Sequence, residues 1–252
     1  MQSLPLREQG RCRPWATEGS LGQPLHFQTA PRPQVRMCLR IVHRTTLMRV
    51  YIFARTPVAG QCKTRLMPRL GARGAAWVQR RLIEKALRTA CAAAGASNVT
   101  LWGAPNAAHG FFMQCRQRFG VRLARQTQGD LGARMRSTLR RTPGLLIGSD
   151  AFGLRVDDLR RAAEALSTAD HVLLPAPDGG YVLIGSRKRL PALAGVAWSS
   201  GRECAQTARK LARSGALAGM TPARDDFDTA ADWRRARRLG QLKPLVQGQG
   251  AD

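Results

Sequence analysis

The chain has 252 residues, of which 44% are hydrophobic, and this length and composition suit one well-buried core. No run of about 18 apolar residues occurs and the first 34 residues hold no compact apolar segment, so neither a transmembrane helix nor a signal peptide is expected. The formal net charge of +25 would suit a polyanion, but the Arg residues are scattered along helical stretches without interleaved aromatics, and nucleic acid is not the partner we expect.

The chain divides into three parts. Residues 1–47 are rich in Pro, Gly and Arg with little periodicity, and they are interpreted as a disordered extension or an incorrectly assigned start. An ordered pattern begins at Met48, and a single domain is predicted over residues 48–240, followed by a polar tail at 241–252. The six cysteines show no CxxC pair and no zinc spacing, which is typical of reduced thiols in a cytoplasmic protein.

From Met48 onwards, strands and helices alternate. Strands are predicted at residues 49–55, 98–102, 121–124, 145–148, 172–175 and 181–185, and helices at 72–94, 107–119, 130–141, 156–166, 201–212 and 229–239. This alternation predicts a three-layer α/β/α domain with a mostly parallel central sheet. In such sheets the ligand lies beyond the carboxyl ends of the strands.

The first candidate motif is the turn after the first strand, residues 57–66. Pro57 and Gly60 shape a tight turn whose backbone N–H groups could face an anion, while Lys63 and Arg65 add two cations. It is not a Walker A sequence, because GxxxxGK[ST] is absent. The alternative is a surface turn with two ordinary basic residues.

Two candidate metal ligands follow from the acidic residues. The buried strand at 145–148 ends at Asp150, which places a carboxylate at the ligand edge, where Mg²⁺ or Mn²⁺ commonly bridges phosphates. Four of the sixteen acids lie within residues 225–232, and Asp228 is a candidate second ligand. The alternatives are a turn or cap role for Asp150 and, for Asp228, the start of the last helix.

Two glycine-containing segments are candidates for substrate contact. In the first, Asp178 precedes Gly179 and Gly180, so that a ligand can approach the backbone closely, and Asp178 could orient or deprotonate an acceptor hydroxyl. A hairpin turn is the alternative. In the second, Gly129 stands at a helix start from which Arg134 could reach a phosphate, the alternative being an ordinary capped helix start.

Together these segments resemble the bacterial DUF2064 family, also called selenodomain-associated transferase 1, which has a glycosyltransferase-A-like fold. The resemblance covers roughly residues 49–239. It rests on six stretches of the sequence: Phe53-Ala54 through Lys63-Thr64-Arg65-Leu66, Gln128-Gly129-Asp130-Leu131-Gly132 with Arg134-Met135, Gly148-Ser149-Asp150, Asp178-Gly179-Gly180-Tyr181 with Leu183-Ile184-Gly185, Trp198-Ser199, and Asp226-Phe227-Asp228-Thr229 with Asp232.

The resemblance implies a nucleotide-diphospho-sugar transferase fold, with the metal aspartate at Asp150 and the basic loop at Lys63 and Arg65. It adds Ala54 to the predicted nucleotide contacts and Tyr181 to the predicted substrate contacts. The chain departs from the family at three positions, where it has Arg55 for the usual Lys, Phe152 for Pro, and Ala133 for an acid. We expect Phe152 to reshape the wall of the pocket beside Asp150, and the loss of the acid at 133 to weaken a catalytic role for that helix start.

Three functions remain open at this point. The leading one is a metal-dependent transferase with a nucleotide or nucleotide-sugar donor and a small-molecule acceptor, in which Asp178 and Arg65 are the candidate catalytic residues. The second is a nucleotidyltransferase that uses the same site and releases pyrophosphate. The third is a non-enzymatic polyanion binder on a decayed enzyme scaffold, which the net charge of +25 suggests.

Overall fold

The structure is a computed structural model that describes residues 48–140 and 144–238. The expectations for residues 1–47 and 241–252 lie outside the described residues. In residues 48–140 and 144–238, no helix combines the length and the apolar character that crossing a membrane requires. The four cysteines in this part of the chain, Cys62, Cys91, Cys115 and Cys204, are free thiols.

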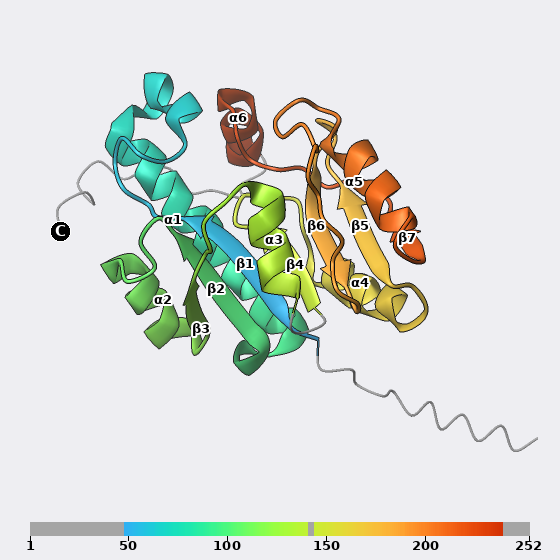
Figure 1. Cartoon of the computed structure of the whole chain (residues 1–252). Coiled ribbons are helices and arrows are strands. Elements are labelled where there is room, and N and C mark those ends of the chain that lie inside the picture. The colour runs from blue at the N-terminus through green and yellow to red at the C-terminus, as the bar shows by residue number, and fades with distance from the viewer. Residues whose placement is uncertain (1–47, 141–143, 239–252) are drawn as a thin grey trace, which may run out of the picture. The chain divides into compact units, whose positions relative to one another are not determined.

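A seven-stranded sheet forms the centre of the domain (Figure 1). Its strands are β1 (Val50–Arg55), β2 (Val99–Ala104), β3 (Arg122–Arg125), β4 (Gly144–Gly148), β5 (His171–Pro175), β6 (Tyr181–Ser186) and β7 (Leu217–Gly219), in the order β3-β2-β1-β4-β6-β5-β7. All pairs are parallel except those of β6, which runs antiparallel to β4 and β5. The predicted class, a mostly parallel sheet with flanking helices, is confirmed.

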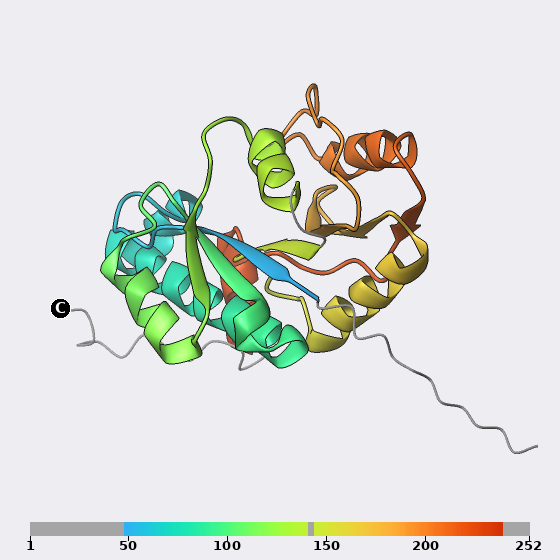
Figure 2. The ribbon, with the colours of Figure 1, turned by 60° about the horizontal axis from the view of Figure 1, so that its bottom comes forward.

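Helices cover both faces of this sheet. They are α1 (Met67–Ala94), α2 (Gly110–Phe119), α3 (Leu131–Leu139), α4 (Val156–Thr168), α5 (Glu203–Ala212) and α6 (Ala230–Arg238), with short 3-10 turns η1 (Thr64–Leu66) and η2 (Ala96–Asn98). Figure 2 shows α1, α2 and α4 on one side of the sheet and α3 and α5 on the other. The chain therefore has the three-layer arrangement that the alternation predicts.

The core follows from the period of two along the strands. In β1 the side chains of Val50 and Ile52 pack under α1 and α2, whereas Tyr51 and Phe53 face α3 on the other side. All four are buried, because a central strand of a covered sheet has no solvated face. A third cluster joins α6 to α1 and contains Phe152, Phe227 and Trp233.

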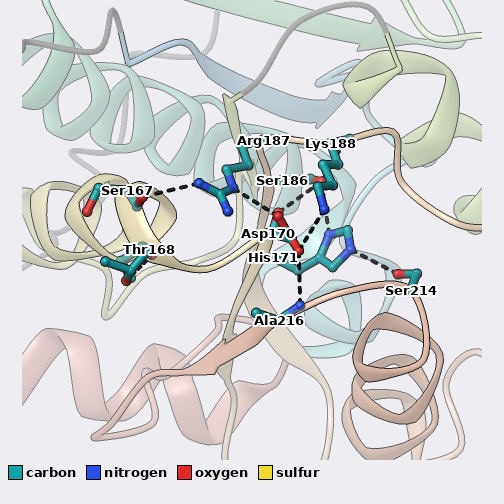
Figure 3. Close-up of polar contacts among 10 residues, drawn as sticks. Ser167, Thr168, Asp170, His171, Ser186, Arg187, Lys188, Ser214 and Ala216 are labelled. Carbon is teal, nitrogen blue, oxygen red and sulfur yellow. Dashed lines mark hydrogen bonds and ion pairs between the residues drawn. The ribbon is translucent and has the colours of Figure 1, made fainter.

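A polar network closes the end of the sheet away from the carboxyl ends of the parallel strands (Figure 3). Asp170, just before β5, accepts hydrogen bonds from Arg187 Nε at 2.9 Å, Lys188 Nζ at 3.0 Å and the Ala216 backbone at 3.1 Å. Hydrogen bonds from Lys188 and Arg187 lower the pKa of Asp170 to about 2. The carboxylate thus ties the start of β5 to the end of β6 and to the strand start of β7.

His171 lies buried beside this carboxylate, between the hydroxyls of Ser186 and Ser214, each 2.9 Å from one ring nitrogen (Figure 3). A neutral imidazole has one N–H, so it donates to one serine and accepts from the other. Burial lowers the pKa of His171, which keeps the ring neutral near pH 7.

Candidate functional site

A cleft of about 980 Å³ opens at the carboxyl ends of β1 and β4. Its position agrees with the rule that open α/β sheets bind ligands there. Residues from the two halves of the sheet and from the loops beyond them line it. Those predicted from the sequence that do so are Ala54, Lys63, Arg65, Gly129, Arg134, Asp150, Asp178, Gly180, Tyr181 and Asp228, whereas Pro57, Gly60 and Gly179 are outside the lining.

Asp150 stands directly beyond β4. The backbone N–H of Ser149 donates to Phe53 O at 2.9 Å, which continues the pairing of β4 with β1 up to the residue before Asp150. A Cβ on Gly148 would lie 2.2 Å from Asp150 Oδ1, so a larger residue there would require this carboxylate to move. The Asp150 side chain is 44% exposed, towards the cleft.

Lys63 meets Asp150 at this point. It adopts a left-handed conformation with φ of 47° at the end of the turn after β1. Its ammonium lies 3.6 Å from Asp150 Oδ2 and 2.6 Å from Asp228 Oδ1, and it also donates to the carbonyl of Phe227. The side chain is only 8% exposed. Burial lowers the pKa of Lys63, but the charges of Asp150 and Asp228 outweigh it and leave this pKa above its usual value.

This arrangement corrects one expectation. The sequence suggests that Lys63 is a cation available to an anionic ligand, yet its ammonium pairs directly with the carboxylates of Asp150 and Asp228. The physical reason is the second acid, because Asp228 draws the ammonium in from the other side. Arg65, which follows Thr64 in the same turn, is exposed and lines the cleft.

The loop that carries Asp228 precedes α6. Asp228 does not cap this helix with its side chain, because Asp232 accepts the backbone N–H groups of Asp228 at 3.0 Å and Thr229 at 2.7 Å. Phe227 is fully buried beneath the loop. The alternative of an ordinary helix start therefore applies to Thr229 and Asp232, and the carboxylate of Asp228 is left to pair with Lys63.

Asp226 is a cleft residue that the sequence reasoning did not single out. Burial, and then the negative charges of Asp178, Asp228 and Asp150, raise the pKa of Asp226 to about 6. The signal in the sequence that points to Asp226 is the concentration of acids at residues 225–232. Four aspartates, Asp150, Asp178, Asp226 and Asp228, thus line the cleft.

Two backbone hydrogen bonds lie within the turn after β1. The N–H of Val58 donates to Thr56 O at 2.9 Å and that of Gln61 to Val58 O at 3.0 Å. Gly60 has φ of 84°, which requires glycine. Pro57 and Gly60 themselves lie outside the cleft lining, and their predicted phosphate contact remains a prediction.

Arg134 approaches the cleft from α3. Its Nη1 donates to Gln126 Oε1 at 2.9 Å, and Gln126 Nε2 donates to Trp102 O at 2.8 Å, so the guanidinium is tethered to the end of β2. Asp130 accepts the Ala133 N–H at 2.7 Å and caps α3, as the alternative for this segment expected. Gly129 precedes the cap with φ of 106° and lines the cleft.

The far side of the cleft is formed by the turn between β5 and β6. Asp178 is exposed and its Oδ1 accepts the Gly180 N–H at 2.9 Å. A Cβ on Gly179 would lie 1.9 Å from Gly201 O, so this glycine allows two loops to touch. Tyr181 is half-buried, and burial raises the pKa of its hydroxyl. Asp178 thus faces the cleft from a turn that its neighbours hold in place.

Phe152 does not reshape the pocket wall, and that expectation is wrong. Its ring is buried away from the cleft, 5.3 Å from that of Phe227 and under the ammonium of Lys85 at 4.8 Å. Gly153 donates its N–H to Asp225 O at 2.8 Å. The aromatic residue therefore joins the loop of Asp150 to the loop of Asp228 from beneath.

Comparisons with known proteins agree with this fold. The family model described as "Uncharacterized protein conserved in bacteria (DUF2064)" matches residues 86–200. None of the curated proteins matches the sequence. A solved structure described as a nucleotide-diphospho-sugar transferase, from Desulfovibrio desulfuricans G20, is similar with a TM-score of 0.67 and 24% identity, over 81% of this chain and 91% of that one.

Two further solved structures share the fold at lower identity. A cytidylyltransferase from Leptospira borgpetersenii is similar with a TM-score of 0.53 and 12% identity, over 79% of this chain and 88% of that one. The 4-diphosphocytidyl-2C-methyl-D-erythritol synthase of Anaerococcus prevotii is similar with a TM-score of 0.52 and 11% identity, over 77% of this chain and 97% of that one. The DUF2064 model thus matches residues 86–200, and the fold of the chain is similar to that of structures described as nucleotide-diphospho-sugar transferases and cytidylyltransferases.

Proposed function

We propose that this protein is a metal-dependent transferase that takes a nucleotide-diphosphate donor and a small-molecule acceptor. One observation carries the proposal: a basic turn and two carboxylates meet at the carboxyl edge of the sheet, with Lys63 Nζ 3.6 Å from Asp150 Oδ2 inside a cleft of about 980 Å³. Paired cations and a metal-binding carboxylate are what stabilisation of a diphosphate requires.

The donor set fits Mg²⁺ or Mn²⁺. Oxygens of Asp150 and Asp228 both face the ammonium of Lys63, which stands in for a cation at that point. Within residues 48–140 and 144–238, no group of three His, Cys, Asp or Glu side chains is arranged to hold an ion. Mg²⁺ is commonly held by one or two carboxylates together with water and substrate phosphates, so Asp150 and Asp228 would hold the ion with water and, once the donor is bound, with its phosphate oxygens.

Three side chains of the cleft have separate roles in the proposed reaction. A bound divalent ion would supply electrostatic stabilisation of the leaving phosphate. Arg65 and Arg134 line the cleft and neutralise phosphate oxygens as negative charge develops. Asp178 orients the acceptor hydroxyl and accepts its proton as the acceptor oxygen bonds to the transferred group and the bond to the donor diphosphate breaks.

Calorimetry with a panel of nucleotides, with and without Mn²⁺, tests the proposal. We expect wild-type protein to bind at least one nucleoside diphosphate or its sugar conjugate in a metal-dependent way, and Asp150→Ala to lose this binding. Asp157→Ala is the matched control, because Asp157 is an exposed carboxylate on α4 outside the cleft. Equal binding by Asp150→Ala, or no nucleotide binding with metal present, would overturn the proposal.

A second candidate is nucleotidyl transfer from an NTP to a phosphorylated acceptor. Two exposed guanidiniums, Arg55 and Arg125, line the cleft in addition to Arg65, and a triphosphate offers more anionic oxygens for them than a diphosphate does. The shared fold with cytidylyltransferases is compatible with both reactions. Pyrophosphate release from an NTP distinguishes this candidate, whereas stabilisation by UDP- or GDP-sugars in a melting assay favours the first.

A further inference from the structure

The ammonium of Lys63 lies where two carboxylates converge. Its distances are 2.6 Å to Asp228 Oδ1 and 3.6 Å to Asp150 Oδ2, and the Phe227 carbonyl accepts a further hydrogen bond. The side chain is 8% exposed, although both aspartates are at least 40% exposed. Lys63 is therefore a counter-ion that is covered from solvent, whereas the two carboxylates with which it pairs remain accessible.

A divalent cation held by the same carboxylates needs the same place. Mg²⁺ takes its oxygens at about 2.0–2.1 Å, shorter than either distance to the ammonium, so one point cannot serve both. The two cations would also repel each other. Lysine carries its charge on a flexible four-carbon stem, and the ammonium can swing away without a change in the backbone.

We propose that Lys63 is a displaceable counter-ion: a divalent cation that enters between Asp150 and Asp228 expels the ammonium, which then becomes a donor for the phosphates of the nucleotide. This inference rests on the proposed function, whose site it deepens. It makes the binding of metal and of diphosphate mutually favourable, because the metal frees a cation that the diphosphate uses.

The cleft beside Lys63 offers a place to which the displaced ammonium can move. Lys63 lines the cleft together with Thr64 and Arg65, which follow it in the 3-10 turn, and Arg65 is already exposed there. A diphosphate that contacts the metal would lie within the cleft beside this turn. The ammonium therefore exchanges one set of anionic oxygens for another.

The first test measures Mn²⁺ binding directly, by the loss of the free-ion EPR signal in the absence of nucleotide. Because the competitor is removed, Lys63→Met is expected to bind Mn²⁺ on the order of tenfold more tightly than wild type. Arg69→Met is the control, since it removes an exposed charge from the start of α1, outside the cleft lining. Its Mn²⁺ affinity should stay within about threefold of wild type, because salt screens exposed charges.

Unchanged or weaker Mn²⁺ binding by folded Lys63→Met would overturn the proposal, since a merely structural lysine would support the site. A second test needs no variant and covers the case in which Lys63→Met does not fold. Amine acylation followed by mass spectrometry reports the reactivity of each of the five lysines in wild-type protein. Mn²⁺ should raise the labelling rate of Lys63 several-fold and leave that of exposed Lys188 unchanged. No change at Lys63 under saturating Mn²⁺ would contradict the displacement.

The outcome is separable from that of the proposed function. If Mn²⁺ displaces Lys63 but no nucleotide binds, the counter-ion proposal stands and the transferase proposal fails. If nucleotides bind only with metal while Lys63 stays unreactive and Lys63→Met binds Mn²⁺ no more tightly, the transferase proposal stands and displacement is wrong.

Discussion

Gly179 lies where the turn that carries Asp178 touches the loop of Gly201, and a Cβ there would be 1.9 Å from the carbonyl oxygen of Gly201. We expect Gly179→Ala to force these loops apart, to cost about 2 kcal/mol or more of unfolding free energy, and to weaken acceptor binding. Chemical denaturation and the KM for acceptor measure the two effects. Backbone carbonyls cannot move aside as a flexible side chain can.

Gly195→Ala is the control for this prediction. Gly195 has a similar positive φ of 76°, but nothing lies within 4 Å of its would-be Cβ. Its substitution should cost about 1 kcal/mol from backbone strain alone, with acceptor binding retained. Equal effects at both positions would show that the contact with Gly201 has no role.

Asp170 gives a pH prediction. Its pKa is lowered to about 2 by the hydrogen bonds from Lys188 and Arg187, below the value of about 3.9 in an unfolded chain. A carboxyl with a depressed folded-state pKa stabilises the fold above its unfolded pKa, and this stabilisation is lost as pH falls towards the folded value. Wild type should therefore exceed Asp170→Asn in stability most at pH 6–7, and the difference should shrink between about pH 4 and 2.

Urea denaturation across this pH range, on both proteins, measures the difference. Asp157→Asn serves as the comparison, because its ion pair with Arg160 is exposed and should contribute little at any pH. A difference between wild type and Asp170→Asn that stays constant down to pH 2.5 would contradict the assignment.

Among the elements, helix α6 packs on α1 and so holds the loop of Asp226 and Asp228 in place. Its Trp233 is buried and packs edge-to-face on Trp77, with ring centroids 6.3 Å apart. Trp233→Ala should cost about 3–5 kcal/mol and weaken metal-dependent nucleotide binding, since the loop loses its anchor. Denaturation and calorimetry test both parts.

Exposed Arg234 on the same helix provides the control. Arg234→Ala should change stability by no more than about 0.5 kcal/mol. If Trp233→Ala lowered stability as expected but bound nucleotide like wild type, the loop would hold its geometry without α6.

The sequence predicts most elements because their periodicity is strong. The apolar spacing over residues 72–94 lies within α1, and the run at 49–55 corresponds to β1. The structure extends α1 back to Met67 across a kink at Gly71, where φ is 67°. The three residues of β7, Leu217–Gly219, are missed, because so short a strand at the sheet edge, half-exposed to exposed, has no readable alternation.

The site is partly predictable for a topological reason. Residues that follow parallel strands meet at one edge, so Lys63 and Asp150 could be expected together. The pairing of Lys63 with Asp228, 165 positions away, depends on how α6 packs, and no local pattern encodes it. The inward turn of Phe152 was missed for the same reason, since its partner Phe227 belongs to a distant segment.

At the scale of the whole molecule, two acids in the described residues each pair with more than one guanidinium. Glu84 lies within 3.5 Å of Arg81, Arg88 and Arg118, and buried Asp158 pairs with Arg224 and Arg161 at 2.8 and 2.7 Å. Such contacts, and exposed arginines on helix faces, agree with the interpretation of the net charge of +25 as dispersed.

Fluorescence anisotropy with single-stranded DNA tests that interpretation. We expect weak association that falls steeply between about 50 and 200 mM salt and is the same for wild type and Asp150→Ala, since only counter-ion release drives it. Tight, salt-resistant binding would instead support the non-enzymatic polyanion binder.

The reversed direction of β6 has a consequence for how this scaffold can diversify. Crossover connections after β1 and β4 carry Lys63, Arg65 and Asp150, which are proposed for the donor, whereas Asp178 stands on a reversing turn between two antiparallel neighbours. A hairpin tip tolerates exchange and lengthening better than a crossover does, because its strands keep their ladder. If Asp178 binds the acceptor as proposed, acceptor choice can therefore change by exchange of residues 176–178 while Gly179 keeps its contact with Gly201, and the residues proposed for the donor stay unchanged.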